Sequence, residues 1–210
     1  MSGTLPVNDF ATVTIKNNTP TATSVSLSGR RQSKQLAAQY WTLECEYTAL
    51  DRSEAAQVMA FLNKQNNSLE SFDVVIPQYS RPAGTVAALG GSPVLSVAAN
   101  AAISATAITV DFDTITSSNL SDATKAFRAG DFIKFSNHNK TYQITDDVTI
   151  NGSGGGTINI FPSLYTAITT SHDVTYWNVP FTVFNTESTQ EYQFTIGDQA
   201  SITLKLHEAL

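Results

Sequence analysis

Residues 40–62 read YWTLECEYTALDRSEAAQVMAFL, and this stretch decides the fold class because it holds the clearest strand and the clearest helix of the chain. A strand is predicted from Tyr40 to Tyr47, in which apolar and polar side chains alternate from Trp41 onwards. A period of two is typical of a strand with one face in a core and the other in water. The apolar face carries Trp41, Leu43, Cys45 and Tyr47.

A helix is predicted directly after this strand. Asp51 and Glu54 form a capping-box pattern, in which Asp51 accepts from a backbone amide and Glu54 reaches back to the start of the helix. Apolar residues then recur at helical spacing, which predicts one buried stripe. The stripe consists of Ala55, Val58, Met59 and Leu62.

The remaining segments favour a mainly β protein. Short runs of Thr, Val, Ile and aromatic residues alternate with Gly, Asn, Asp, Ser and Pro. Residues 98–105 fit either a helix or a loop. Two hairpins are expected, one joining residues 132–135 to 141–145 and one joining 148–150 to 157–160. Further strands are expected at residues 12–15, 24–27, 72–76, 94–97, 107–110, 181–184, 192–196 and 201–207.

A change of composition predicts two domains. Residues 83–108 are rich in Ala, Gly and Ser, and the last thirty or so residues regain the character of the first part. We expect one domain from residues 1–80 together with 180–210, and a second domain, residues 81–179, inserted between them. Several short strands in the insertion suit a small closed barrel, for which the oligonucleotide/oligosaccharide-binding (OB) fold is one option.

Charge and hydropathy exclude several classes of protein. The chain of 210 residues has a formal net charge of -6 and only 14% charged residues, against roughly 25% in average soluble proteins. An acidic chain is poorly suited to binding a phosphate backbone, which requires clustered Lys and Arg. No stretch reaches the roughly 18 apolar residues of a membrane span. The first residues lack a signal-peptide pattern, so we expect a chain made in the cytosol that stays soluble.

The residues with catalytic or ligand-binding chemistry form no recognisable site. The Gly-rich run at residues 152–156 lacks the Lys of a phosphate-binding loop and precedes a strand, so a hairpin tip is the better interpretation. The three histidines lack metal-ligand spacing and are expected at the surface. They are His138, His172 and His207.

The acidic pairs and the cysteine also have structural interpretations. Asp111 and Asp113 could share a strand face and hold calcium, but a role at a turn or strand end is favoured. The other acidic pair is Asp146 and Asp147. Cys45 lies on the apolar strand face, which favours a buried thiol over a nucleophile. We therefore predict no catalytic residue, no metal site and no cofactor.

Aromatic residues near strand ends are the remaining candidates for function. Aromatic side chains are enriched in the cores of protein interfaces and serve as stacking platforms in OB-fold binders, although core packing is the ordinary role of each one. The set comprises Tyr40, Trp41, Tyr79, Tyr165, Tyr176, Trp177 and Phe181.

The order of these segments resembles the distal tail proteins of long-tailed bacteriophages. The resemblance runs from the aromatic-led strand at residues 38–47 and the helix with Ala60-Phe61-Leu62 to a strand ending at Pro77. It continues through the Gly-Asp strand and its return at residues 129–144, the strand-Pro segment at 160–165 and the closing strand at 201–210. The similarity is greatest to the small coliphage type with an OB-like inserted domain.

This resemblance implies a non-enzymatic structural protein of the virion, made in the host cytoplasm. It implies a ring-forming β-sandwich or barrel domain that closes into a homo-oligomeric ring, commonly six-fold, between the tail tube protein and the tip hub protein. The inserted domain would hold side-fibre or collar proteins or touch host saccharide. Neither membrane insertion nor stable nucleic-acid binding is expected.

Two sets of contact residues are predicted. We expect the ring interface along strand edges near residues 10–28 and 181–210. Its candidate side chains are Tyr40, Trp41, Tyr79 and Phe181. The candidate saccharide or partner contacts on the inserted domain are Tyr142, Tyr165, Tyr176 and Trp177.

Two alternatives remain open from the sequence. A tail tube subunit has a related fold and would form a long polymer instead of a single ring. A free carbohydrate-binding module would use the aromatic residues of the barrel and stay monomeric.

Overall fold

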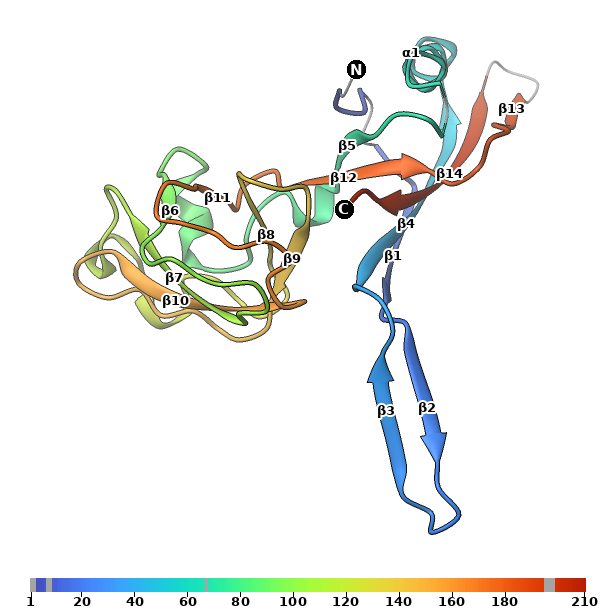
Figure 1. Cartoon of the computed structure of the whole chain (residues 1–210). Helices are drawn as coiled ribbons and strands as arrows, with labels where there is room; N and C mark the ends of the chain where they lie inside the picture. The colour runs from blue at the N-terminus through green and yellow to red at the C-terminus, as the bar shows by residue number, and fades with distance from the viewer. Residues whose placement is uncertain (1–2, 7–8, 67, 195–198) are drawn as a thin grey trace. The chain divides into compact units, whose positions relative to one another are not determined.

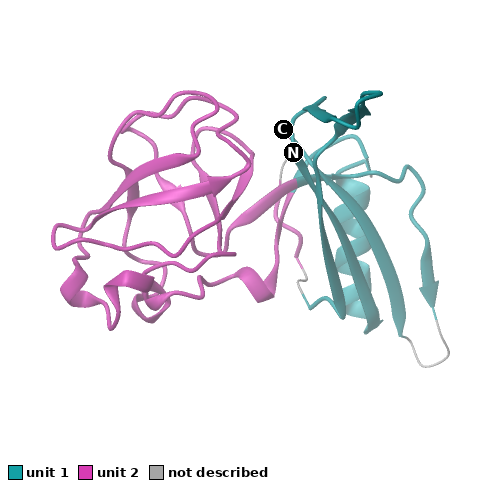
Figure 2. Ribbon diagram, turned by 90° about the horizontal axis from the view of Figure 1, so that it is seen from below, with its two compact units in different colours: residues 1–2, 9–72, 183–209 teal, residues 3–8, 73–182, 210 magenta. Residues whose placement is uncertain are grey.

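The computed structural model describes residues 3–6, 9–66, 68–194 and 199–210, which form two compact units. Unit 1 contains Asp9–Phe72 and Val183–Ala209, and unit 2 contains Gly3–Asn8 and Asp73–Thr182 (Figure 2). Between Asp9 and Ala209 the chain enters unit 2 after Phe72 and returns to unit 1 after Thr182. The sequence predicts one domain from residues 1–80 with 180–210 and a second from residues 81–179. These domain bounds stay a prediction.

The first sheet has the strand order β1-β4-β14-β12-β5, with β13 paired to β14 beside β12. Strand β4 pairs antiparallel with β1 and β14, and β14 also pairs antiparallel with β12 and β13. The pairing of β14 with β4 extends along almost the whole length of β4. Its strands are β1 (Thr12–Asn18), β4 (Tyr40–Leu50), β5 (Phe72–Val75), β12 (Pro180–Asn185), β13 (Tyr192–Phe194) and β14 (Ala200–Glu208).

The predicted alternation of buried and exposed residues is confirmed in β4. Trp41, Leu43, Cys45 and Tyr47 are all buried, and the residues between them are partly exposed. In β14 the same pattern buries Ile202, Leu204 and Leu206. Helix α1 (Arg52–Lys64) contacts both strands and has a buried face of its own, which places the core of unit 1 between helix and sheet.

The predicted capping box is confirmed at the start of α1. The backbone N–H of Glu54 donates to Asp51 Oδ1 at 2.8 Å, and the Asp51 N–H donates to Glu54 Oε2 at 3.2 Å. Ala55, Val58 and Leu62 are buried, as the stripe predicts, while Met59 is only half-buried. The cap and the stripe together fix where the helix begins and which face it buries.

A two-stranded hairpin forms a sheet of its own between β1 and β4 (Figure 1). It consists of β2 (Thr21–Val25) and β3 (Arg31–Gln35). The strand predicted at residues 24–27 was wrong in its bounds, because β2 ends at Val25 and the next residues form the turn. Gly29, with φ +78°, supplies the left-handed conformation that this turn requires.

The second sheet, in unit 2, has the order β11-β8-β9-β10-β7-β6 and is nearly closed on itself. The two end strands approach each other, because a bridge joins Ser96 to Asp173 and the Val97 N–H donates to His172 O at 3.0 Å. The strands are β6 (Leu95–Val97), β7 (Ala107–Phe112), β8 (Phe132–Phe135), β9 (Thr141–Ile144), β10 (Gly155–Phe161) and β11 (Val174–Thr175).

One predicted hairpin of unit 2 is confirmed, and the other differs. Strands β8 and β9 pair through Phe132↔Gln143, Ile133↔Tyr142 and Lys134↔Thr141. Residues 148–150 form only isolated bridges, among them Ile150↔Gly156, and β10 pairs instead with β7 and β9. Residues 98–105 form no helix, and a bridge joins Ala101 to Ile168.

Four short 3₁₀ helices connect the strands of unit 2. The strands enclose an apolar core that includes Ile108, Val110, Ile133, Tyr142 and Ile158, all fully buried. The 3₁₀ helices are η1 (Pro77–Tyr79), η2 (Thr85–Leu89), η3 (Ser117–Asn119) and η4 (Ala123–Lys125).

The predicted fold class is confirmed: the described residues form a mainly β protein with one α-helix and a barrel-like sheet. Whether the barrel is OB-like stays a prediction. The last part of the strand predicted at residues 192–196, residues 195–196, lies outside the described residues. No helix in the described part of the chain is long and apolar enough to cross a membrane.

Candidate functional site

The hairpin β2–β3, hereafter the arm, is the most exposed element of the chain. Every residue of both strands is exposed, and the register from Thr21↔Gln35 to Val25↔Arg31 is uninterrupted. Its apolar side chains also face water, with Val25 64% and Leu36 67% exposed. An isolated two-stranded hairpin is marginally stable in water, so a regular arm of this kind is suited to contact another molecule.

The arm is also strongly basic. Arg30, Arg31 and Lys34 lie on it, and the sequence contains no Asp or Glu between Asp9 and Glu44. None of these cations has an ion-pair partner among the described residues. On a chain with a net charge of -6, the arm is therefore a local region of opposite charge.

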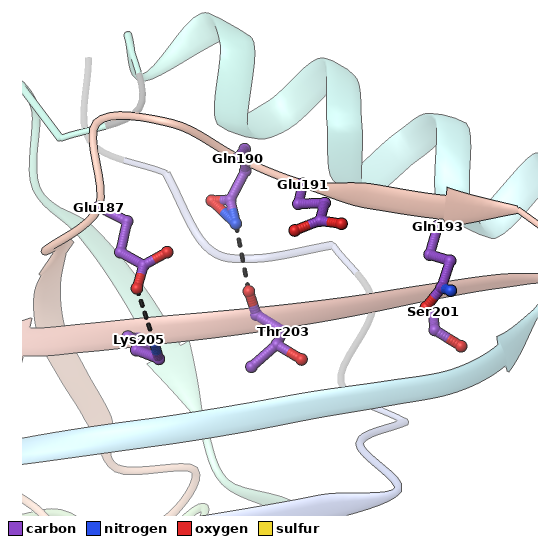
Figure 3. A pocket seen from close by; sticks show the side chains of 7 residues that line it. All are labelled: Glu187, Gln190, Glu191, Gln193, Ser201, Thr203 and Lys205. Atoms are coloured by element: carbon purple, nitrogen blue, oxygen red, sulfur yellow. Dashed lines mark hydrogen bonds and ion pairs between the residues drawn. The ribbon is translucent and has the colours of Figure 1, made fainter.

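A polar groove, of about 350 Å³, lies along β14 beside the loop that precedes β13 (Figure 3). Lys205 Nζ pairs with Glu187 Oε1 at 2.7 Å, and Gln190 Nε2 donates to Thr203 O at 3.2 Å. The Glu191 side chain has no ion-pair partner among the described residues. The lining includes Glu187, Gln190, Glu191, Ser201, Thr203 and Lys205.

The polar face of the neighbouring strand β4 extends this groove with further carboxylates. Glu46 lies opposite Thr203, and Glu44 lies opposite Lys205, so their side chains share the face on which the groove opens. Lys16 Nζ pairs with Glu44 Oε2 at 2.8 Å and lowers the pKa of that carboxyl. Glu46, like Glu191, has no ion-pair partner in the described part of the chain.

The edge of the first sheet is a third exposed feature. In the described sheet β1 pairs with β4 alone, so its other edge keeps unpaired backbone N–H and C=O groups. Exposed edges of this kind pair readily with other chains, and proteins often protect them with charged side chains such as Lys16. Edge β1 falls within the predicted interface region at residues 10–28.

The four predicted ring-interface aromatics differ in how much surface they offer. Trp41 and Phe181 are only 4% and 1% exposed, so they pack inside the chain and have little area left for a neighbour. Tyr40 is half-buried and stacks on His207, with ring centroids 4.2 Å apart. Tyr79 is 40% exposed and meets Phe132 edge-on.

The aromatics predicted for saccharide or partner contact divide in the same way. Tyr142 and Tyr176 are buried, and their hydroxyl groups are used internally: Tyr142 OH accepts from the Tyr165 N–H at 2.9 Å, and Tyr176 OH donates to Pro93 O at 2.7 Å. Tyr165 itself is 47% exposed. Trp177 is half-buried, and the Arg81 guanidinium lies 5.4 Å above its ring.

All three histidines are half-buried, so each reaches the surface with part of its ring while the rest contacts neighbouring residues. His207 stacks between Tyr40 and Phe184. His172 Nδ1 accepts from the Thr169 N–H at 3.0 Å. His138 lies 2.7 Å from Tyr142 OH through Nε2, and its burial lowers the pKa of the imidazole to about 4. These are packing and hydrogen-bonding roles that the spacing of His residues in the sequence does not show.

The other singled-out residues have structural roles. Cys45 is fully buried, and burial raises the pKa of its thiol to about 12, as expected for an inert cysteine. Asp113 Oδ1 accepts from Val94 N–H and Thr114 Oγ1, in keeping with a strand end. The Gly-rich run forms the turn into β10, where Asn151 Oδ1 accepts from Gly155 N–H at 3.0 Å. The described residues contain no cluster of three metal-ligating side chains.

Comparison with known proteins defines the class to which this architecture belongs. A family model described as the distal tail protein pb9, A domain, N-terminal, matches residues 4–79, and one for the B domain of the same protein matches residues 94–179. The chain belongs to the distal tail proteins of bacteriophages, which confirms the resemblance stated from the sequence. It is therefore related to structural proteins of a virus particle.

One particular relative can be named. The chain is 25% identical over 204 residues to the distal tail protein pb9 of Escherichia phage T5, which covers 96% of this chain and 92% of that protein. The two chains thus correspond over almost their whole lengths, and both domain types of the relative are represented here.

Proposed function

We propose that this chain closes into a ring of identical copies at the end of a phage tail tube and joins the tube to the tip hub. The single observation that carries this proposal is the arm. A regular hairpin whose strands are exposed along their whole length gains little from its own chain, so its order is best explained by a contact made in an assembly.

The geometry of a ring fits one arm per copy. In a closed cyclic assembly each subunit presents two different surfaces, one to each neighbour. An arm on one side and a complementary surface on the other satisfy this requirement without a second type of subunit. The exposed edge of β1 and the partly exposed rings of Tyr40 and Tyr79 are the further contact candidates.

Unit 2 is proposed to carry the peripheral contacts. We assign to the inserted domain, residues 81–179, the binding of side-fibre or collar proteins. The exposed Tyr165 and the half-buried Trp177 are the aromatics that retain surface for such a partner. Because the family is structural, we propose no catalytic activity, and we place the mature protein in the virion after synthesis in the host cytoplasm.

Cryo-electron microscopy of the particle that contains this chain tests the proposal. The expected result is one closed ring between tail tube and tip hub, with the arm of each copy buried against a neighbour. A stack of many rings along the tail would identify a tube subunit instead. A chain that occurs free of any tail and binds on a glycan array would identify a carbohydrate-binding module.

A further inference from the structure

The distribution of charge in unit 1 indicates which two surfaces meet between neighbouring copies of the ring. The arm holds Arg30, Arg31 and Lys34 without any acidic residue nearby in the sequence. Arg30 lies at the turn. Arg31 and Lys34 are three positions apart in β3, so their side chains lie on opposite faces of the strand. A surface that receives the arm must therefore offer negative charge along a channel.

The groove along β14 offers that charge. Four carboxylates lie on or beside it, and within the part of the chain that the structure describes two of them have an ion-pair partner: Glu44 pairs with Lys16 at 2.8 Å and Glu187 with Lys205 at 2.7 Å. Glu46 and Glu191 have no counter-ion among the described residues. The groove, of about 350 Å³, is lined mainly by polar side chains, which suits a polar arm better than an apolar peptide.

We propose that the basic arm of one copy docks in the acidic groove of the next copy, with Arg30, Arg31 and Lys34 facing Glu46 and Glu191. This inference rests on the ring proposed above and names the surface that receives the arm. Within the described part of one chain the arm cations and these two carboxylates are all without ion-pair partners. When two copies meet, the cations of one arm and the carboxylates of the neighbouring groove become ion-pair partners.

A charge-reversal cycle on the full-length chain tests the pairing. The arm variant is R30E/R31E, the groove variant is E46K/E191K, and the combined variant carries all four changes. The matched control is R52E/K64E, which alters the net charge as much as the arm variant but on two exposed residues of α1 without ion-pair partners in the described structure. Self-association is measured by sedimentation velocity at rising concentration, and incorporation into phage particles is measured in parallel.

We expect the arm and groove variants each to associate about tenfold more weakly at low salt, since several exposed charge pairs become repulsive. The combined variant regains association, because the reversed arm again meets a groove of opposite sign. The control behaves as the unchanged chain. The differences shrink at about 0.5 M salt, where screening shortens the reach of surface charges.

The outcomes separate this inference from the ring itself. A combined variant that stays as weak as the arm variant, while the unchanged chain still forms rings, shows that the arm has another occupant and overturns the pairing alone. Equal effects of the control and the arm variant overturn it as well, because net charge would then explain the loss. If the unchanged chain forms no ring in solution or in particles, the proposed ring function is wrong, and the pairing that rests on it is wrong as well.

Discussion

His138 shows how a single residue of unit 2 couples packing to pH. Its Nδ1 lies 2.6 Å from Asn137 Oδ1 and its Nε2 lies 2.7 Å from Tyr142 OH, so both ring nitrogens have polar partners. Burial is the largest cause that lowers the pKa of the imidazole from 6.5 to about 4, and the nearby positive charge of Lys134 acts in the same direction. The folded chain therefore holds the neutral ring.

A pH dependence of stability follows from this shift. A group whose pKa is lower in the folded than in the unfolded chain contributes stability that is present above pH 6.5 and is lost as the pH falls towards 4. We expect a loss of about 1–3 kcal/mol in the unfolding free energy of unit 2 from this residue. Urea unfolding of the unchanged chain and of His138→Gln between pH 7 and pH 4 measures the difference. Parallel pH profiles for the two chains would contradict this assignment.

Tyr142 permits a second test at the scale of one atom. Its hydroxyl oxygen accepts from the Tyr165 N–H at 2.9 Å and also contacts His138. Tyr142→Phe removes this oxygen and leaves two partners without it, which is expected to cost about 1–3 kcal/mol of unfolding free energy. Tyr165→Phe, on a side chain that is 47% exposed, is the control and should change stability by less than about 0.5 kcal/mol. Equal effects of the two substitutions would show that the buried hydroxyl is not the cause.

At the scale of elements, the start of α1 is held by its capping box. Asp51→Ala removes the acceptor of the Glu54 N–H and is expected to cost about 1 kcal/mol. Thermal unfolding followed by far-ultraviolet circular dichroism measures the change. Arg52→Ala, one position later on the exposed surface, is the matched control and should have little effect. A substitution of Asp51 without effect would mean that packing against the sheet alone places the helix.

The arm can be removed without touching the core. Asn18 and Tyr40 are paired at the ends of β1 and β4, and the adjoining Gln39 is buried. A two-residue Asn-Gly turn can therefore replace residues 20–38 and leave Gln39 in place. We expect the shortened chain to keep the unfolding temperature of unit 1 within a few degrees, since the strands of the arm are exposed throughout. Ring formation, followed by electron microscopy of assembled particles, should be lost. Rings built from the shortened chain would refute a role of the arm in assembly.

The sequence predicts elements best where a local pattern suffices. The alternation in β4, the capping box at Asp51 and the hairpin of β8 and β9 depend on neighbouring residues, and all three are confirmed. The predicted pairing of residues 148–150 with 157–160 was mostly wrong, because β10 instead pairs with β7 and β9. A choice between distant partners depends on the closure of the whole sheet, which a short pattern does not encode.

The candidate site was harder to predict than the fold for a related reason. Exposure separates Tyr79 from Phe181 and Tyr165 from Tyr142, yet all four occur in similar aromatic contexts of the sequence. The arm gives a weak local signal, because only Thr21–Val25 carries β-forming residues in number. Its charge, with three cations and no acid between Asp9 and Glu44, is the feature from which it could have been found.

At the scale of the whole molecule, two cores imply two unfolding units. Leu43 in unit 1 and Ile133 in unit 2 are both fully buried. Leu43→Ala and Ile133→Ala should each cost about 2–5 kcal/mol, confined to the unit that holds the residue. Hydrogen exchange of peptides from each unit, measured by mass spectrometry, distinguishes the two effects. The same loss of protection throughout the chain in both variants would show one cooperative unit instead.

Because the thiol of Cys45 is buried, a dye can be attached selectively to an introduced cysteine to follow assembly of the particle. The chain contains one cysteine, and that sulfur is fully buried with a strongly raised pKa. A cysteine introduced at Ser28, in the exposed turn of the arm, would be the only thiol open to a maleimide dye. The emission wavelength and intensity of this fluorophore would then report, in real time, when the turn of each arm becomes buried during tail assembly.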